Sequence, residues 1–212
     1  MRKTALFLAA FVILIVSGTV VFAETSICQK FPAAKVTGQG PIPYNCRLID
    51  GHILAGGHPL NPRKFENTDQ QVAAIFKFLK EEGVENIIDL ENSSAVQKRY
   101  ARLLEQAGLT RLHVPMNNAK VPTAAEWAKI KELMKQPVYI HCRWGADRTG
   151  AVIARYLIEE AGYSTVEAWQ AVVNGGSHAG LLGGLKNKPD YRNLILFISP
   201  KAADYQEFKA YF

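Results

Sequence analysis

Cys142 and Arg148 are the residues whose types and spacing most directly suggest chemistry. They lie in the segment HCRWGADRTG, residues 141–150, which follows the apolar run VYI and precedes a helical pattern. A thiol at the carboxyl end of a buried strand, facing a helix amino terminus, lies where open α/β sheets bind ligands. The peptide N–H groups of residues 143–148 can surround an anion there, and the same field favours a nucleophilic thiolate.

The other residues of this loop are consistent with a phosphate site. Gly145 permits a backbone conformation that other residues resist, and the Arg148 guanidinium can hold two phosphate oxygens in a fork. We expect the side chains of Arg143 and Trp144 at the pocket rim. The predicted phosphate-binding loop comprises Arg143, Trp144, Gly145, Ala146, Asp147 and Arg148. This pattern favours phosphoryl transfer to sulfur, which needs neither a metal ion nor a cofactor, and the histidines show no metal-ligand spacing.

The segment HCRWGADRTG resembles the signature loop of the cysteine-based protein tyrosine phosphatases, and GHILAGGHP, VENIIDLE and HVPMNN look like the preceding segments of the compact dual-specificity branch. The resemblance implies that Cys142 attacks phosphorus to form a phosphocysteine and that Arg148 binds the phosphate and stabilises the transition state. It also implies that the Thr149 hydroxyl assists breakdown of the intermediate. His141 would orient the loop, although a satisfied core histidine is an equal alternative.

The general acid departs from the family pattern. The usual aspartate on an earlier loop falls here on Asn118, whose amide cannot donate a proton usefully at neutral pH. Asp147 is our preferred substitute, because loops of the form Gly-x-Asp-Arg-Thr resemble those of myotubularin-type lipid phosphatases, in which the loop aspartate is the acid. Glu126 is a weaker candidate, since a helix cap with Thr123 explains it. Lys120 would add positive charge for a multiply phosphorylated substrate, although a solvated lysine is the default reading.

Three functions remain open at this point. The first is a metal-independent phosphatase acting on a phosphotyrosine protein, a phosphoinositide or an inositol phosphate. The second is a non-catalytic phosphate-binding module, which the asparagine at position 118 favours. The third is a thiol redox enzyme of the arsenate-reductase kind, which shares the Cys-x5-Arg loop but needs resolving cysteines close to the nucleophile. The formal net charge of +6 falls to +4 if Arg2 and Lys3 leave with a cleaved leader, and this charge is too small and too scattered to indicate nucleic acid binding.

The first residues, MRKTALFLAAFVILIVSGTVVFAET, have the layout of a secretory signal peptide, with cleavage expected after Ala23. The protein is then periplasmic or secreted; the alternative is a membrane anchor formed by residues 4–23, the only predicted contact with a membrane. Export favours disulfide formation, and the chain has three cysteines. We therefore expect Cys28 and Cys46 to pair, which leaves Cys142 as the reactive thiol.

The elements around the loop predict an α/β fold with a mostly parallel sheet covered by helices on both faces, of the dual-specificity phosphatase type. Capping pairs Thr68–Gln71, Ser94–Gln97 and Thr123–Glu126 begin three helices. Strands are expected at VENIIDL, RLHVPM and PVYIHC, with one or two more over residues 45–62, and a helix over residues 149–160. The domain organisation predicted is a signal peptide at 1–23, an extension at 24–44 and a catalytic domain at 45–212.

Overall fold

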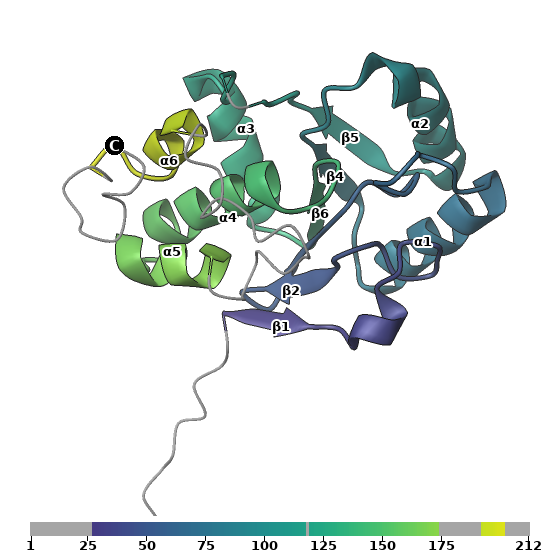
Figure 1. Cartoon of the computed structure of the whole chain (residues 1–212), viewed down its shortest axis with the longest axis horizontal. Helices are drawn as coiled ribbons and strands as arrows, with labels where there is room; N and C mark the ends of the chain where they lie inside the picture. The colour runs from purple at the N-terminus through teal and green to yellow at the C-terminus, as the bar shows by residue number, and fades with distance from the viewer. Residues whose placement is uncertain (1–26, 118, 174–191, 202–212) are drawn as a thin grey trace, which may run out of the picture.

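The computed structural model describes residues 27–117, 119–173 and 192–201 (Figure 1). Four parts of the chain lie outside these residues: the predicted signal peptide, Asn118, the glycine-rich segment 174–190 and the terminal segment 203–212. No helix in the described ranges is long and apolar enough to cross a membrane. The order of elements and the sheet confirm the predicted α/β class.

Six strands form one sheet in the order β1-β2-β3-β6-β4-β5. β3, β6, β4 and β5 run parallel to one another, whereas β1 and β2 add an antiparallel edge. The strands are β1 Cys28–Lys30, β2 Arg47–Ile49, β3 Ile53–Gly56, β4 Asn86–Asp89, β5 Thr110–His113 and β6 Val138–His141. β1 comes from the predicted extension, so residues 28–30 are part of the sheet.

Helices cover both faces, and the capping pairs set where several of them begin. The helices are α1 Asp69–Glu81, α2 Ser94–Ala107, α3 Ala124–Met134, α4 Asp147–Glu159, α5 Thr165–Val173 and α6 Arg192–Ile198, after a short 3-10 turn, η1, at Ala33–Lys35. Complete capping boxes precede α1 and α3, as predicted. The prediction for α2 was wrong by one residue: Ser93 occupies the cap, and its N–H donates to Glu91 Oε1. The sequence reasoning missed α5, and α4 begins two residues earlier than expected.

The sheet separates two apolar clusters. Buried residues of α1 and α2 pack with Leu54, Ile87 and Tyr139 on one face, and residues of α3, α4, α5 and α6 pack with Ala55 and Ile140 on the other. The chain runs outward from β3 to β4 and β5 and then returns to β6 between β3 and β4. Because right-handed crossovers change face when the direction reverses, this return places α3 opposite α1 and α2. Ligands bind at such reversals, at the carboxyl ends of the strands.

The predicted disulfide between Cys28 and Cys46 was wrong, because both residues are buried as thiols. Cys28 pairs with Ile49 across the β1–β2 ladder, and Cys46 lies an odd number of positions before Ile49. Successive residues of a strand alternate in face, so Cys28 and Cys46 pack into different apolar clusters. Burial raises the pKa of Cys46 to about 12 and also raises that of Cys28, which makes both thiols poor nucleophiles.

Candidate active site

The loop between β6 and α4 wraps closely over the end of β3. Gly145 has φ of +69°, and a Cβ added there would lie 2.2 Å from the carbonyl carbon and oxygen of Gly56. Gly57 also lies close, since its own added Cβ would be 3.2 Å from the Arg143 carbonyl oxygen. The Gly56-Gly57 pair and Gly145 therefore allow two backbone segments to approach within a distance that side chains would prevent.

The carbonyl groups of this loop all accept hydrogen bonds from surrounding elements. The Cys142 oxygen accepts from His141 Nδ1 at 3.2 Å, and the Arg143 oxygen accepts from the His58 N–H at 2.9 Å. The Trp144 oxygen accepts from Asn45 Nδ2 at 3.2 Å, and the Gly145 oxygen accepts from Arg47 Nη2 at 2.7 Å. The Ala146 oxygen accepts from the Gly150 N–H at 2.7 Å. A trans peptide directs its N–H opposite to its C=O. The N–H groups of residues 143–147 are therefore turned away from these donors, as an anion-binding nest requires.

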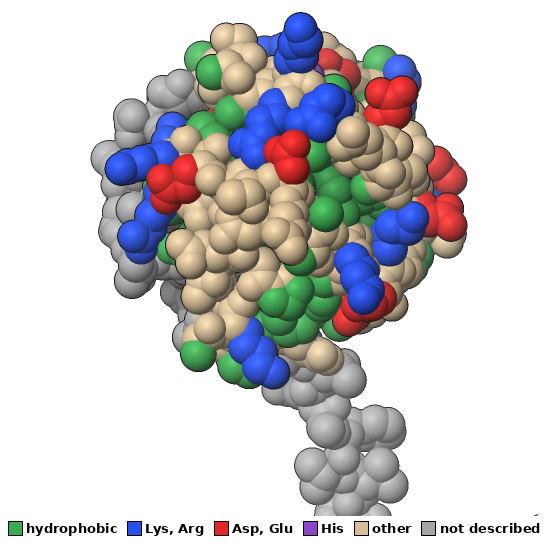
Figure 2. Space-filling view, turned by 90° about the vertical axis from the view of Figure 1, so that its right-hand side faces the viewer, with side chains coloured by type: hydrophobic (Ala, Val, Ile, Leu, Met, Phe, Trp, Pro, Cys, Tyr) green, Lys and Arg blue, Asp and Glu red, His purple; other side chains and the backbone are tan. Residues whose placement is uncertain are grey.

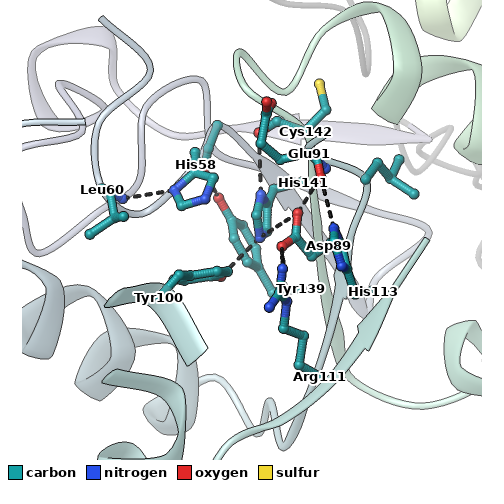
Figure 3. Close-up of polar contacts among 12 residues, drawn as sticks. His58, Leu60, Asp89, Glu91, Tyr100, Arg111, His113, Tyr139, His141 and Cys142 are labelled. Atoms are coloured by element: carbon teal, nitrogen blue, oxygen red, sulfur yellow. Dashed lines mark hydrogen bonds and ion pairs between the residues drawn. The ribbon is translucent and has the colours of Figure 1, made fainter. Parts of the chain in front are cut away.

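His141 is fully buried directly before Cys142, with its ring inside a polar cluster (Figure 3). Because its Nδ1–H donates to the Cys142 carbonyl, its Nε2 accepts from the Tyr100 hydroxyl at 2.8 Å. Burial lowers the pKa of His141, and Asp89, 3.8 Å from Nε2, partly opposes that shift. Arg111 neutralises Asp89 with two hydrogen bonds to Oδ2. A neutral His141 with a fixed tautomer thus holds the first peptide group of the loop.

His58 packs edge-on against His141, with ring centroids 4.9 Å apart, and its N–H holds the Arg143 carbonyl. Its Nδ1 accepts from the Leu60 N–H at 3.1 Å, while Nε2 is buried and makes no hydrogen bond within the described residues. Burial first, and then the neighbouring positive charges, hold the pKa of His58 well below its usual range. Both histidines beneath the loop are therefore neutral at physiological pH.

Arg148 lies in the first turn of α4, and its guanidinium is held by the loops after β4 and β5. Nη1 donates to the carbonyls of Leu90 and Met116 at 3.0 and 3.1 Å, and Nη2 pairs with Glu91 Oε2 at 3.1 Å. Glu91 is only 2% exposed, and its other carboxylate oxygen accepts from the Ser93 N–H. The carboxyl ends of two parallel strands thus fix the position of the candidate phosphate-binding arginine.

The remaining predicted site residues lie around the same loop. Asp147 is the first residue of α4 and is partly buried. The Thr149 hydroxyl is fully buried and makes no hydrogen bond to any described residue. Arg143 bonds to the carbonyls of Pro62 and Arg63. Trp144 packs edge-on against Tyr44, with ring centroids 5.6 Å apart.

The alternative acids contribute less to this site. Asn118 lies outside the described residues, and Lys120, two positions later, is exposed. Glu126 is tied into the capping box of α3, where hydrogen bonds from the Thr123 backbone and hydroxyl lower its pKa. A carboxyl group with a lowered pKa is a poor proton donor at neutral pH, which is consistent with a capping role.

A separate hollow lies between α1 and α2. Figure 2 shows this face of the molecule, with lysine and arginine side chains around an exposed apolar area. The hollow is lined by Asp69, Gln70, Ala73, Phe76, Lys77, Lys80, Glu81, Leu103, Gln106 and Ala107. None of the predicted site residues lines it, so this hollow is distinct from the phosphate loop.

The family model described as "Polymorphic toxin system, DSP-PTPase phosphatase" matches residues 63–162, a range that includes β4, β5, β6 and the whole phosphate loop. The matched residues resemble the domain of cysteine-based, dual-specificity-like phosphatases. This match agrees with the resemblance stated from the signature loop, and it supports phosphatase activity. A search of curated proteins gives no match.

Solved structures of phosphatases have the same fold as this chain. TpbA from P. aeruginosa aligns with a TM-score of 0.56 at 17% identity, over 89% of this chain and 96% of TpbA. A cysteine-to-serine variant of TpbA in complex with phosphotyrosine aligns with a TM-score of 0.55 at 16% identity, over the same shares of the two chains. Tk-PTP in its active form aligns with a TM-score of 0.54 at 16% identity, over 74% of this chain and 97% of that protein.

Sequence reasoning missed Asn45, Arg47 and Glu91. Each is a polar residue with less than a tenth of its surface exposed, at or near the end of a strand. Asn45 and Arg47 lie almost 100 positions from the loop carbonyls that they bind. For Arg47 the available signal was a polar residue within an otherwise apolar strand, because a buried polar side chain requires a partner.

Proposed function

We propose that this phosphatase hydrolyses phosphomonoesters through a phosphocysteine on Cys142, without a metal ion. The observation that carries the proposal is the set of loop carbonyls held outward beside Cys142, because it turns successive N–H groups toward one anion site. Arg148 and these N–H groups would supply the positive charge that phosphoryl transfer requires. The proposal makes the phosphate loop a catalytic site rather than only a binding site.

The proposed reaction has two steps. In the first, the Cys142 thiolate attacks phosphorus, the bond from phosphorus to the ester oxygen breaks, and Asp147 gives its proton to the leaving oxygen. In the second, water attacks phosphorus, the phosphorus–sulfur bond breaks, and Asp147 takes the proton from the water. The buried Thr149 hydroxyl would donate a hydrogen bond to the departing sulfur. Phosphate leaves, and the thiolate is restored.

We propose an aryl phosphate, such as phosphotyrosine in a protein, as the substrate class to test first. The complex of the TpbA variant with phosphotyrosine supports this choice. The aromatic side chains of Trp144 and Tyr44 beside the loop would pack against an aryl ring. Phosphoinositides and inositol phosphates are the comparison substrates, and a higher kcat/KM for either would replace the aryl class.

The proposed activity is tested by release of phosphate from an aryl phosphate in the presence of a chelator, for the wild-type protein and for Cys142→Ser. We expect turnover by the wild-type protein and at least a roughly thousandfold loss in the variant, because the nucleophile is removed. If the protein binds phosphate but shows no hydrolysis that depends on Cys142, it is a phosphate-binding module instead.

The role of Asp147 is tested separately by the leaving group. Asp147→Asn should slow hydrolysis of an alkyl phosphate much more than hydrolysis of an aryl phosphate with an acidic phenol, since only the poor leaving group needs a proton. Glu126→Gln provides the matched carboxylate control and addresses the weaker candidate acid. Equal losses on both substrates in Asp147→Asn would rule out Asp147 as the proton donor.

A further inference from the structure

Arg47 is a fully buried arginine that reaches the phosphate loop from an antiparallel strand outside the parallel core of the sheet. Its side chain is 0% exposed. Nη1 donates to the Asn45 carbonyl at 2.8 Å, and Nη2 donates to the Gly145 carbonyl at 2.7 Å. Asn45 is itself buried, and its Nδ2 donates to the carbonyls of Trp144 and Gly145 at 3.2 and 3.3 Å. Two side chains of one short segment therefore hold the middle of the loop.

These contacts fix the orientation of two peptide groups. The Trp144 carbonyl belongs to the same peptide plane as the Gly145 N–H, and the Gly145 carbonyl to the same plane as the Ala146 N–H. The peptide groups on either side of a glycine rotate more easily than those beside other residues, because glycine has no Cβ. Gly145, whose φ is positive, therefore leaves both of these peptide groups easy to rotate. Without donors behind the loop, these two peptides could turn their carbonyl oxygens toward the anion site. The hydrogen bonds from Asn45 and Arg47 oppose that rotation.

The charge of Arg47 is a second observation. None of the described residues forms a carboxylate ion pair with it; the contacts of its guanidinium given above are to carbonyl oxygens, and its Nε is buried with no hydrogen-bond partner. A buried guanidinium with no counter-charge is costly, and it becomes favourable when an anion lies close by. Cys142 is near enough to interact electrostatically with Arg47. A bound phosphate in the loop would supply the missing negative charge.

We propose that Arg47, together with Asn45, is a positioning residue of the phosphate site: it holds the Gly145 and Ala146 N–H groups in the anion-binding orientation and favours the occupied loop by its buried charge. This inference rests on the proposed function, because it requires that the loop binds phosphate. Arg47 touches the backbone of the loop rather than the reacting atoms, so it acts through the loop.

The test compares Arg47→Met, Arg47→Lys and Asn45→Ala with the wild-type protein. The affinity for inorganic phosphate is measured by calorimetry, and kcat and KM are measured with an aryl phosphate. We expect Arg47→Met to weaken phosphate binding by at least about tenfold and to raise KM by a similar factor. Arg47→Lys should recover part of the loss, since it keeps the charge and can donate to one carbonyl. Asn45→Ala should weaken binding while leaving the buried charge in place.

Ile49→Ala is the matched control for loss of stability. Ile49 is fully buried on the same face of β2 as Arg47, at the end of the strand away from the loop. It should lower the free energy of unfolding while leaving the affinity for phosphate unchanged. If Arg47→Met does not fold, Asn45→Ala decides the question.

The outcomes separate this inference from the proposed function. Folded Arg47→Met or Asn45→Ala with wild-type affinity for phosphate would overturn the positioning role while leaving the phosphatase assignment intact. A wild-type protein that neither binds inorganic phosphate nor hydrolyses aryl phosphate would overturn both. Weaker binding in both variants, unchanged binding in Ile49→Ala and partial recovery in Arg47→Lys would support the inference.

Discussion

Two arginines, the fully buried Arg47 and the partly buried Arg148, lie at the phosphate loop on different sides. Arg148 belongs to the loop and is held by Glu91 and by carbonyls of the neighbouring loops. Arg47 comes from β2 and holds the loop from behind. In the proposed mechanism the first arginine binds phosphate oxygens, whereas the second orients the peptide groups that surround them. At this scale the site consists of one thiol together with donors whose positions other residues fix.

Glu91→Gln tests how far the position of Arg148 depends on its carboxylate partner. The amide would place an N–H₂ group or a neutral oxygen against Nη2, and the hydrogen bond to a charged group would be lost or weakened. We expect kcat/KM to fall by about 10- to 100-fold, since such bonds contribute roughly 1.5–3 kcal/mol. Steady-state kinetics with an aryl phosphate measures the change.

Glu132→Gln is the control for that substitution. Its carboxylate pairs with Lys135 on the exposed surface of α3, away from the loop. Wild-type kcat/KM in Glu91→Gln would show that the contacts from the Leu90 and Met116 carbonyls suffice to place the guanidinium.

Only some residues of the site could be predicted from the sequence. Cys142, Gly145, Arg148 and Thr149 fall within eight consecutive positions, so their spacing alone indicated a phosphate loop. Asn45, Arg47 and Glu91 reach this loop only through the pairing of distant strands. Local spacing carries the first kind of information, while the second depends on the order of strands in the sheet, which no local pattern specifies.

At the level of elements, the starts of α1 and α3 were predictable because a capping box lies within four residues. The start of α2 was predicted one residue too late, and the cause is local. The Glu91 carboxylate accepts a hydrogen bond from the Ser93 N–H, and the Gln97 amide donates to the Ser93 carbonyl. The predicted disulfide failed for a different reason. The spacing of two cysteines does not show on which face of a sheet each one lies.

Gly145→Ala tests the close approach between the loop and β3. An added methyl group would meet the Gly56 carbonyl at 2.2 Å, and Ala also disfavours the φ of +69°. To avoid this contact the loop would have to move further than an anion-binding site allows its N–H groups to be displaced. We therefore expect phosphate binding and turnover to fall by roughly 100-fold or more. Calorimetry with inorganic phosphate and steady-state kinetics measure the two losses.

Gly51→Ala is a matched control, because Gly51 has a similar φ of +74° but no atom within 4 Å of an added Cβ. It should destabilise the fold by about 1 kcal/mol through backbone strain, with kcat/KM unchanged. Equal losses of activity in both variants would show that positive φ, rather than contact with β3, controls the loop.

For the molecule as a whole, the α/β class followed from the alternation of strand and helix patterns, and the structure confirms it. The antiparallel β1 and β2 were less predictable, because short strands of three residues carry little periodicity. In the proposed mechanism they matter for function, since β2 carries Arg47. The polar cluster below the loop joins α2, β4, β5 and β6, so it links the site to the stability of the fold (Figure 3).

The two buried histidines predict loss of stability in acid. Burial lowers the pKa of His58 and His141 in the folded state, whereas the ordinary value of 6.5 applies on unfolding. The unfolded chain therefore binds more protons below about pH 6.5, and the free energy of unfolding should fall there by up to about 1.4 kcal/mol per pH unit for each histidine. Urea unfolding between pH 8 and 5 measures this slope, which is absent above pH 7.

His58→Gln removes one of the two titrations and should make that slope shallower. The comparison uses the slope rather than the absolute free energy, because the substitution also changes packing against Tyr100 and Phe65. A slope identical to that of the wild-type protein would show that His58 does not contribute to the acid sensitivity.

The most direct test of the proposed mechanism is to trap the intermediate. Wild-type protein is mixed with an aryl phosphate, quenched within milliseconds, digested and analysed by mass spectrometry. We predict that one phosphoryl group is found on the peptide that contains Cys142, that it forms with the burst of phenol release, and that Cys142→Ser neither carries it nor turns over substrate. Turnover that persists in Cys142→Ser, or a phosphoryl group on another residue, would contradict the proposed phosphocysteine.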